Sequence, residues 1–273
     1  MSYEGPDEGG LNYYPCRYEG SRSVFRGPQV PIDGPFTAVI GGSEVYGRFV
    51  EDPFTDQLAE RTGRHVVNLG LPNAGLDAFI LDEGLMKILA RAEVVVVQAM
   101  GAQNMSNRYY TVHPRRNDRF LKPSKQLARL YHEVDFSDFS FTRHMLSTLR
   151  RTSPQRFSLV VEELRAAWIA RMQLLFSRLP GQRVLLSLEG TADHGLGPDP
   201  LFVDHEMMQA LEPSIDKAVQ CDLTDLEDAP DLSEMIFSDR DRPAAERSLT
   251  PAGHERIADA LTRVVRRANG MAA

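Results

Sequence analysis

Short apolar runs alternate with stretches of helical spacing along most of the chain. Apolar runs predict four buried strands, at residues 36–40, 65–68, 93–99 and 183–188, and a weaker run predicts a fifth at 217–222. Helical spacing predicts the main helices, at residues 52–62, 76–90, 156–178, 203–212 and 251–269. Strands that alternate with helices in this way are typical of a parallel sheet covered by helices on both faces.

Two segments depart from this alternation. Residues 1–35 are rich in Gly and Pro with interspersed Tyr and Phe, which predicts an extended arm anchored by its aromatic side chains. Residues 100–155 are too long for a simple connection and predict an insertion after the third strand. We therefore expect residues 36–273 to form one α/β domain, a flavodoxin-like three-layer sandwich with a central parallel sheet of about five strands.

Three turns follow the first three strands. In a flavodoxin-like strand order, ligands bind at the carboxyl edge of the sheet, where the first and third strands are neighbours. Gly42 and Ser43 follow the first strand, Asn73 and Gly75 follow the second, and Asn104 follows the third. Ser43 at this edge offers a hydroxyl, and Asn104 offers a side-chain amide to a developing oxyanion. The alternative for each position is a helix cap or a plain turn.

These turns, in this order, resemble those of the SGNH (GDSL-like) hydrolases. The resemblance implies a nucleophilic Ser43, with an oxyanion hole formed by Asn104 and the backbone N–H of Ser43 and Gly75, or of Asn73 in its place. Residues 249–258, with the sequence Leu-Thr-Pro-Ala-Gly-His-Glu-Arg-Ile-Ala, are similar to the start of the family's last helix. The Cys-Arg-Tyr of the arm and residues 101–119 also resemble a bacterial family built on this scaffold, which implies no activity.

The sequence departs from the SGNH pattern at the catalytic base. Ala245 and Ser248 stand where the family has its Asp and His, and a serine hydroxyl is a weak nucleophile without a base. His113 and His254 are candidate substitutes, and His194 is a third. The alternative for each is an ordinary histidine without a catalytic role.

A basic segment lies within the expected insertion. Residues 105–130 hold seven Lys/Arg and one Asp, in a chain of net charge −7. Arginines interleaved with aromatics suit phosphate, sulfate, carboxylate or sugar recognition. The candidate ligand-binding residues are Gly42, Asn73, Arg108, Arg115, Arg116 and Arg119. The alternative is that the arginines pair with the acid-rich residues 199–239.

Composition limits the classes of partner. The negative net charge gives no reason to expect a nucleic-acid partner. No apolar run approaches the roughly 20 residues of a membrane helix. The beginning of the sequence shows no secretory signal, so we expect a cytoplasmic location. Cys16 and Cys221 match no zinc or redox spacing, so no metal site is expected, and both a disulfide and a homo-oligomer stay open.

Two functions follow as hypotheses. The first is an SGNH-type esterase or deacylase acting without a cofactor on a small acyl ester or an O-acylated carbohydrate. The alternative is a catalytically inactive protein on the same scaffold that binds an anionic or saccharide ligand. Nucleotide-dependent group transfer is disfavoured, because the sequence has neither a P-loop nor a dinucleotide fingerprint.

Overall fold

A five-stranded parallel sheet forms the centre of the computed structural model, which describes residues 10–190, 195–227 and 230–267. The strand order is β2-β1-β3-β6-β7, so the first and third strands are neighbours as expected. The strands are β1 (Phe36–Gly41), β2 (His65–Gly70), β3 (Val94–Gln98), β6 (Gln182–Glu189) and β7 (Lys217–Asp222). The α/β fold and the parallel sheet predicted from the sequence are confirmed.

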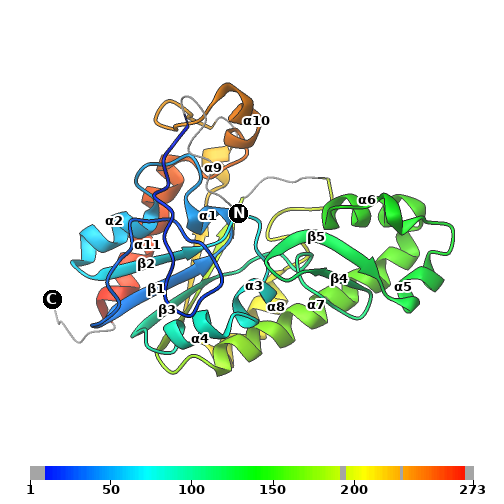
Figure 1. Cartoon of the computed structure of the whole chain (residues 1–273), viewed down its shortest axis with the longest axis horizontal. Coiled ribbons are helices and arrows are strands. Elements are labelled where there is room, and N and C mark those ends of the chain that lie inside the picture. Colours follow the sequence, from blue (N-terminus) through cyan, green and yellow to red (C-terminus); the bar gives the residue numbers. More distant parts are fainter. Residues whose placement is uncertain (1–9, 191–194, 228–229, 268–273) are drawn as a thin grey trace.

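Helices cover both faces of the sheet and make it the middle of three layers (Figure 1). On one face lie α2 (Phe54–Thr62) and α11 (Pro251–Arg267); on the other lie α3 (Asp77–Ile80), α4 (Glu83–Leu89) and α7 (Pro154–Ser177). In β3, Val94 and Val96 pack on the α2–α11 side, and Val95 and Val97 pack on the α7 side. All four are buried, which explains an uninterrupted apolar run instead of an alternating one.

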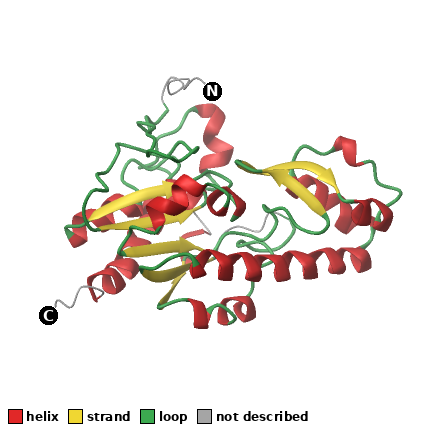
Figure 2. Cartoon of the chain, turned by 60° about the horizontal axis from the view of Figure 1, so that its bottom comes forward, coloured by secondary structure: helices red, strands yellow, loops and turns green. Residues whose placement is uncertain are grey.

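The expected insertion after β3 contains a two-stranded antiparallel hairpin and further helices. Its elements are β4 (Tyr110–His113), β5 (Arg116–Pro123), α5 (Lys125–Leu130), the 3-10 helix η1 (Phe136–Asp138) and α6 (Thr142–Thr152). The long helix α7 packs against the sheet near one end and extends along the insertion (Figure 2). Trp168 of α7 donates a hydrogen bond to the Met100 carbonyl at 2.7 Å, which ties the helix to the start of the insertion.

Short helices complete the chain after β6. They are α8 (His205–Gln209), η2 (Glu212–Ser214), α9 (Thr224–Glu227), η3 (Asp239–Asp241) and α10 (Arg242–Ala245). Two predicted helices are each divided in the structure. Residues 76–90 form α3 and α4, because Asp82 caps α4 by accepting from the Leu85 N–H, and residues 203–212 form α8 and η2.

The N-terminal arm, described from residue 10, is fastened to the segment that follows β1. Its buried Arg26 donates hydrogen bonds to the carbonyls of Tyr46, Gly47 and Glu51, at the end of α1 (Ser43–Tyr46) and beyond it. Cys16 of the arm and Cys221 of β7 are free thiols. Among the described residues, no helix combines the length and apolarity that crossing a bilayer requires.

Candidate functional site

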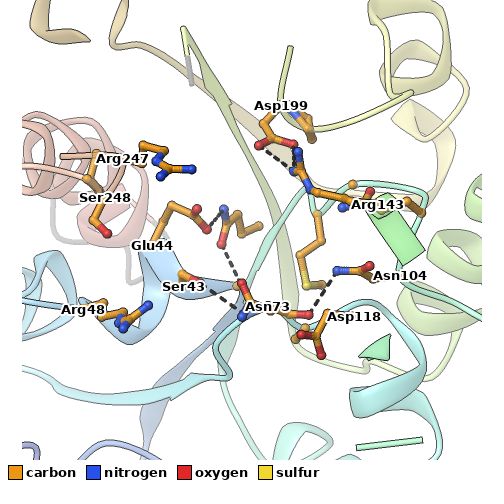
Figure 3. A pocket seen from close by; sticks show the side chains of 18 of the residues that line it. Ser43, Glu44, Arg48, Asn73, Asn104, Asp118, Arg143, Asp199, Arg247 and Ser248 are labelled. Carbon is orange, nitrogen blue, oxygen red and sulfur yellow. Dashed lines mark hydrogen bonds and ion pairs between the residues drawn. The ribbon is translucent and has the colours of Figure 1, made fainter. Parts of the chain in front are cut away.

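Ser43, Asn73 and Asn104 meet at the carboxyl edge of the sheet. They follow β1, β2 and β3, and β1 lies between the other two strands. The backbone N–H of Asn73 donates to the Ser43 hydroxyl oxygen at 3.2 Å, and the side-chain amide of Asn104 donates to the Asn73 carbonyl at 3.1 Å (Figure 3). The backbone of Asn73 therefore connects the two side chains that the sequence singles out.

Two local features hold this connection in place. Asn73 has a φ of 55°, in the left-handed region that Asn tolerates better than most residues. Asn104 is 7% exposed, and its side-chain oxygen accepts a hydrogen bond from the Thr142 hydroxyl at 2.8 Å. Thr142 belongs to α6, so the insertion fixes the orientation of the Asn104 amide.

Gly75 brings two loops together instead of donating at the site. Its N–H donates to the side chain of Asn117 at 2.9 Å, and the N–H of Ala78 donates to the same oxygen. A Cβ at Gly75 would collide with the Asn104 carbonyl oxygen, so only glycine allows this approach. Asn73, not Gly75, presents the backbone N–H that faces Ser43. Sequence reasoning missed the fully buried Asn117, which looked like one more polar residue in a basic loop.

Gln98 and Glu44 are further site residues that the sequence reasoning missed. Gln98 is 5% exposed; its side chain accepts from the Gly42 N–H at 2.9 Å and donates to the Glu44 carboxylate at 2.9 Å. This bridge fixes the Glu44 carboxylate on the same edge as Ser43 (Figure 3). The signal in the sequence is a single polar residue that ends a run of four valines.

These residues border a cavity of about 690 Å³. The sheet edge supplies Ser43 and Asn73, the insertion supplies Phe141 and Thr142, and the segment before α11 supplies Ser248. The charged residues lining the cavity are four arginines (Arg48, Arg143, Arg240 and Arg247) and three carboxylates (Glu44, Asp118 and Asp199). The cavity is thus polar and has one formal positive charge in excess.

The four arginines differ in their partners. Arg143 donates to both carboxylate oxygens of Asp199, at 2.7 and 2.9 Å, and Arg48 forms an ion pair with Asp241 at 3.4 Å. Within the part of the chain that the structure describes, Arg240 and Arg247 form no ion pair. Among the described residues, the Arg247 side chain donates only to the Pro243 carbonyl, at 2.9 Å, and it extends toward the space above Glu44 (Figure 3).

The arginines predicted to bind ligand lie outside the cavity lining. Arg108 pairs with Glu163 at 2.9 Å, and the guanidinium of Arg119 stacks over the Phe141 ring at 3.9 Å. Arg115 and Arg116 lie at the turn between β4 and β5. Gly42 and Asn73, the other two predicted ligand-binding residues, do line the cavity.

The candidate bases are also placed away from Ser43. His254 is fully buried and its Nδ1 accepts from the Phe54 N–H at 3.1 Å; burial, followed by the nearby Arg26 charge, lowers its pKa to about 3. The His113 Nδ1 accepts two backbone N–H groups of the hairpin turn. No described histidine lines the cavity, and His194 lies outside the described residues.

Ser248, in contrast, lines the cavity at the position where the SGNH resemblance puts a histidine. Its hydroxyl donates to the Ala244 carbonyl at 2.8 Å. Ala245, at the position of the family's Asp, is fully buried in a small apolar cluster with Phe49 and Met235. The backbone therefore presents position 248 to the site, while the environment of position 245 suits an apolar side chain.

Comparison with known proteins identifies a family and no activity. A search of curated proteins found no match to the chain. One family model matches residues 1–269, so the match includes the arm, the sheet, the insertion and the closing helix. The chain therefore belongs to the family described as "Domain of unknown function (DUF6473)".

Proposed function

We propose that the cavity at the carboxyl edge of the sheet binds a small ligand carrying an anionic group. The observation that carries this proposal is the position of Arg247, whose guanidinium extends into the space shared with Ser43 and has no carboxylate partner among the described residues. Guanidinium groups bind carboxylate, phosphate and sulfate through paired, charge-assisted hydrogen bonds. Arg240 lines the same cavity and adds a second positive charge.

The sheet edge supplies the neutral contacts for such a ligand. The Ser43 hydroxyl oxygen accepts a hydrogen bond from Asn73. Because a hydroxyl can accept and donate at the same time, the Ser43 O–H can still donate to an acceptor on the ligand. Glu44, fixed by Gln98, accepts hydrogen bonds and disfavours a second anionic group beside it. The expected ligand therefore has its anionic group toward Arg247 and a neutral polar part toward Ser43 and Asn104.

Ester hydrolysis of the SGNH type is the second candidate function. It is favoured by one observation, namely that the Asn73 N–H and the Asn104 amide both lie at the edge that holds Ser43. An oxyanion needs such donors, and the Asn73 N–H would first have to leave the Ser43 oxygen to which it donates. His113 and His254 are engaged elsewhere, so we expect Ser43 to react slowly with esters. Labelling of folded protein by a serine-reactive phosphonate, lost in Ser43→Ala, would support hydrolysis over binding.

A thermal-shift experiment tests the binding proposal. The probes are inorganic phosphate, inorganic sulfate and monosaccharides that carry a carboxylate or a phosphate. Binding to the native state raises the melting temperature, and Arg247→Met should abolish the rise. Arg178→Met, which removes an exposed arginine at the end of α7, is the matched control. A rise of the same size in both variants would contradict the assignment of the site.

The cytoplasmic location stays a prediction from the sequence, as do a saccharide ligand, an acyl ester substrate and the exclusion of nucleic acid.

A further inference from the structure

Arg247 and Glu44 border the same part of the cavity without pairing with each other. Both line the cavity, and the Arg247 side chain extends toward the Glu44 carboxylate (Figure 3). Among the described residues, no ion pair joins the two, and neither has another partner of opposite charge. One cavity wall thus presents a guanidinium and a carboxylate that both lack a counter-charge.

Each of these side chains is held so that part of it stays free. The Arg247 Nε donates to the Pro243 carbonyl at 2.9 Å, which leaves Nη1 and Nη2 without a hydrogen-bond partner in the described part of the chain. Oε2 of Glu44 accepts from Gln98 at 2.9 Å, and Oε1 has no partner there. Arg247 is exposed and Oε1 of Glu44 is accessible, so these atoms can reach a molecule in the cavity.

The Glu44 carboxylate restricts which anion can bind beside Arg247. An anionic group that pairs with Nη1 and Nη2 of Arg247 also approaches Glu44, and the two negative charges repel. A cationic group on the same ligand turns this repulsion into attraction, because it neutralises Glu44 while the anionic group neutralises Arg247. A zwitterion therefore satisfies both side chains, whereas a simple anion satisfies only one.

The head group of an α-amino acid carries both charges on one carbon atom. Its planar carboxylate matches the paired Nη groups of a guanidinium, and its ammonium has three N–H donors for nearby acceptors. Glu44 is one such acceptor. The hydroxyl of Ser248, which lines the same cavity, donates to the Ala244 carbonyl, so its oxygen is a second acceptor.

We propose that Arg247 and Glu44 form a site for the head group of a free α-amino acid, with the carboxylate bound by Arg247 and the ammonium by Glu44. This site rests on the proposed function, because the carboxylate is the anionic group assigned there to Arg247. The rest of the cavity, toward Ser43 and Asn104, receives the side chain of the amino acid, and its polar lining favours a polar one.

The experiment compares an amino acid with the same molecule lacking its amino group. The proteinogenic L-amino acids are first screened with the full chain by thermal shift. The amino acid that raises the melting temperature most and its deaminated counterpart, such as L-glutamine and glutaramate, are then titrated calorimetrically. The amino acid should bind at least about 10-fold more tightly, because only it offers Glu44 a cation.

Glu44→Gln should remove this preference. The variant keeps an oxygen that accepts from Gln98 but loses the charge, so the amino acid should bind about 10-fold more weakly and the deaminated acid at least as tightly as to the wild type. A folding defect would weaken both ligands, so opposite responses identify the charge of Glu44 as the cause. Glu60→Gln, at an exposed position of α2, is the matched control and should bind both ligands as the wild type does.

The outcomes separate this site from the proposed function. Equal affinities of the amino acid and its deaminated counterpart in the wild type would overturn the head-group site. An unchanged preference in Glu44→Gln would also overturn it, as would binding of inorganic phosphate or D-glucuronate when no amino acid binds. Failure of every anion and every amino acid to bind would instead overturn the proposed function.

Discussion

The backbone N–H of Asn73 donates a hydrogen bond to the hydroxyl oxygen of Ser43 at 3.2 Å. The two residues belong to turns 30 positions apart, and the pairing of β1 with β2 brings those turns together. The Asn73 carbonyl accepts from Asn104, so one peptide segment sets the spacing of the three turns. The shape of the site therefore depends on the left-handed backbone of a single residue.

Substitutions at Asn73 should separate backbone conformation from side-chain chemistry. Asn73→Gly adopts a φ of 55° without strain and should change the free energy of unfolding little. Asn73→Val places a β-branched residue in the same conformation and should lower that free energy by about 1–3 kcal/mol. Urea unfolding measures both. Equal stability of the two variants would show that the left-handed conformation is not required.

Ser248→His should test whether the edge can support ester hydrolysis. The variant places an imidazole at a position that lines the cavity with Ser43. A positioned general base raises reaction rates by about 10²–10⁴-fold, so hydrolysis of p-nitrophenyl acetate should rise at least about tenfold over the wild type. The rise should vanish in the double variant with Ser43→Ala. Activity that persists in the double variant would assign it to the histidine alone.

His254 should make the stability of the protein depend on pH. Its pKa falls from 6.5 in the unfolded chain to about 3 in the folded protein, because burial, followed by Arg26, disfavours the charged ring. The unfolded state therefore binds the proton first, and the stability present above pH 6.5 is lost as the pH falls toward 3. This residue alone should lower the free energy of unfolding by about 2 kcal/mol between pH 7 and pH 5.

The comparison for this prediction is His254→Asn, which keeps an acceptor near the Phe54 N–H but does not titrate in this range. Chemical unfolding at several pH values should show a smaller slope in the variant. Identical slopes in the two proteins would contradict the prediction, because they would mean that His254 has the same pKa in the folded and unfolded states.

Arg26 should stabilise the segment that carries Ser43 and Arg48. Replacement by Met leaves three backbone carbonyls without their donor and should lower the free energy of unfolding by about 2–4 kcal/mol. Anion binding should weaken as well, because the loop after α1 loses its anchor. Arg22→Met removes an exposed arginine of the same arm and is the matched control. A loss of equal size in both variants would contradict a specific role for Arg26.

The central sheet could be predicted because its strands are unbroken apolar runs separated by helical spacing. The hairpin β4–β5 could not, since its pairing is irregular on both sides of Val112 and its outer strand is rich in charged residues. Local charge also misled the assignment of the ligand arginines. Arg119 stacks on Phe141, while Arg247, which has no carboxylate partner among the described residues, lies in residues 239–247, where three acidic residues balance three arginines.

Only part of the candidate site could be predicted from the sequence, for a related reason. Ser43, Asn73 and Asn104 follow strands, so the topology alone predicts that they meet. Glu44 and Gln98 interact through a side-chain hydrogen bond that spans 54 positions, and no local pattern predicts such a contact. Arg143 and Arg247 reach the cavity from separate segments, and only the folded chain brings them to one place.

Anion binding in this cavity should depend on Arg247 above all. Calorimetric titration of inorganic phosphate and of D-glucuronate into the wild type, Arg247→Met and Arg178→Met tests it most directly. We expect saturable binding of at least one of them to the wild type and to Arg178→Met, and at least about 10-fold weaker binding to Arg247→Met. Equal affinity in all three proteins, or no binding to the wild type, would contradict it.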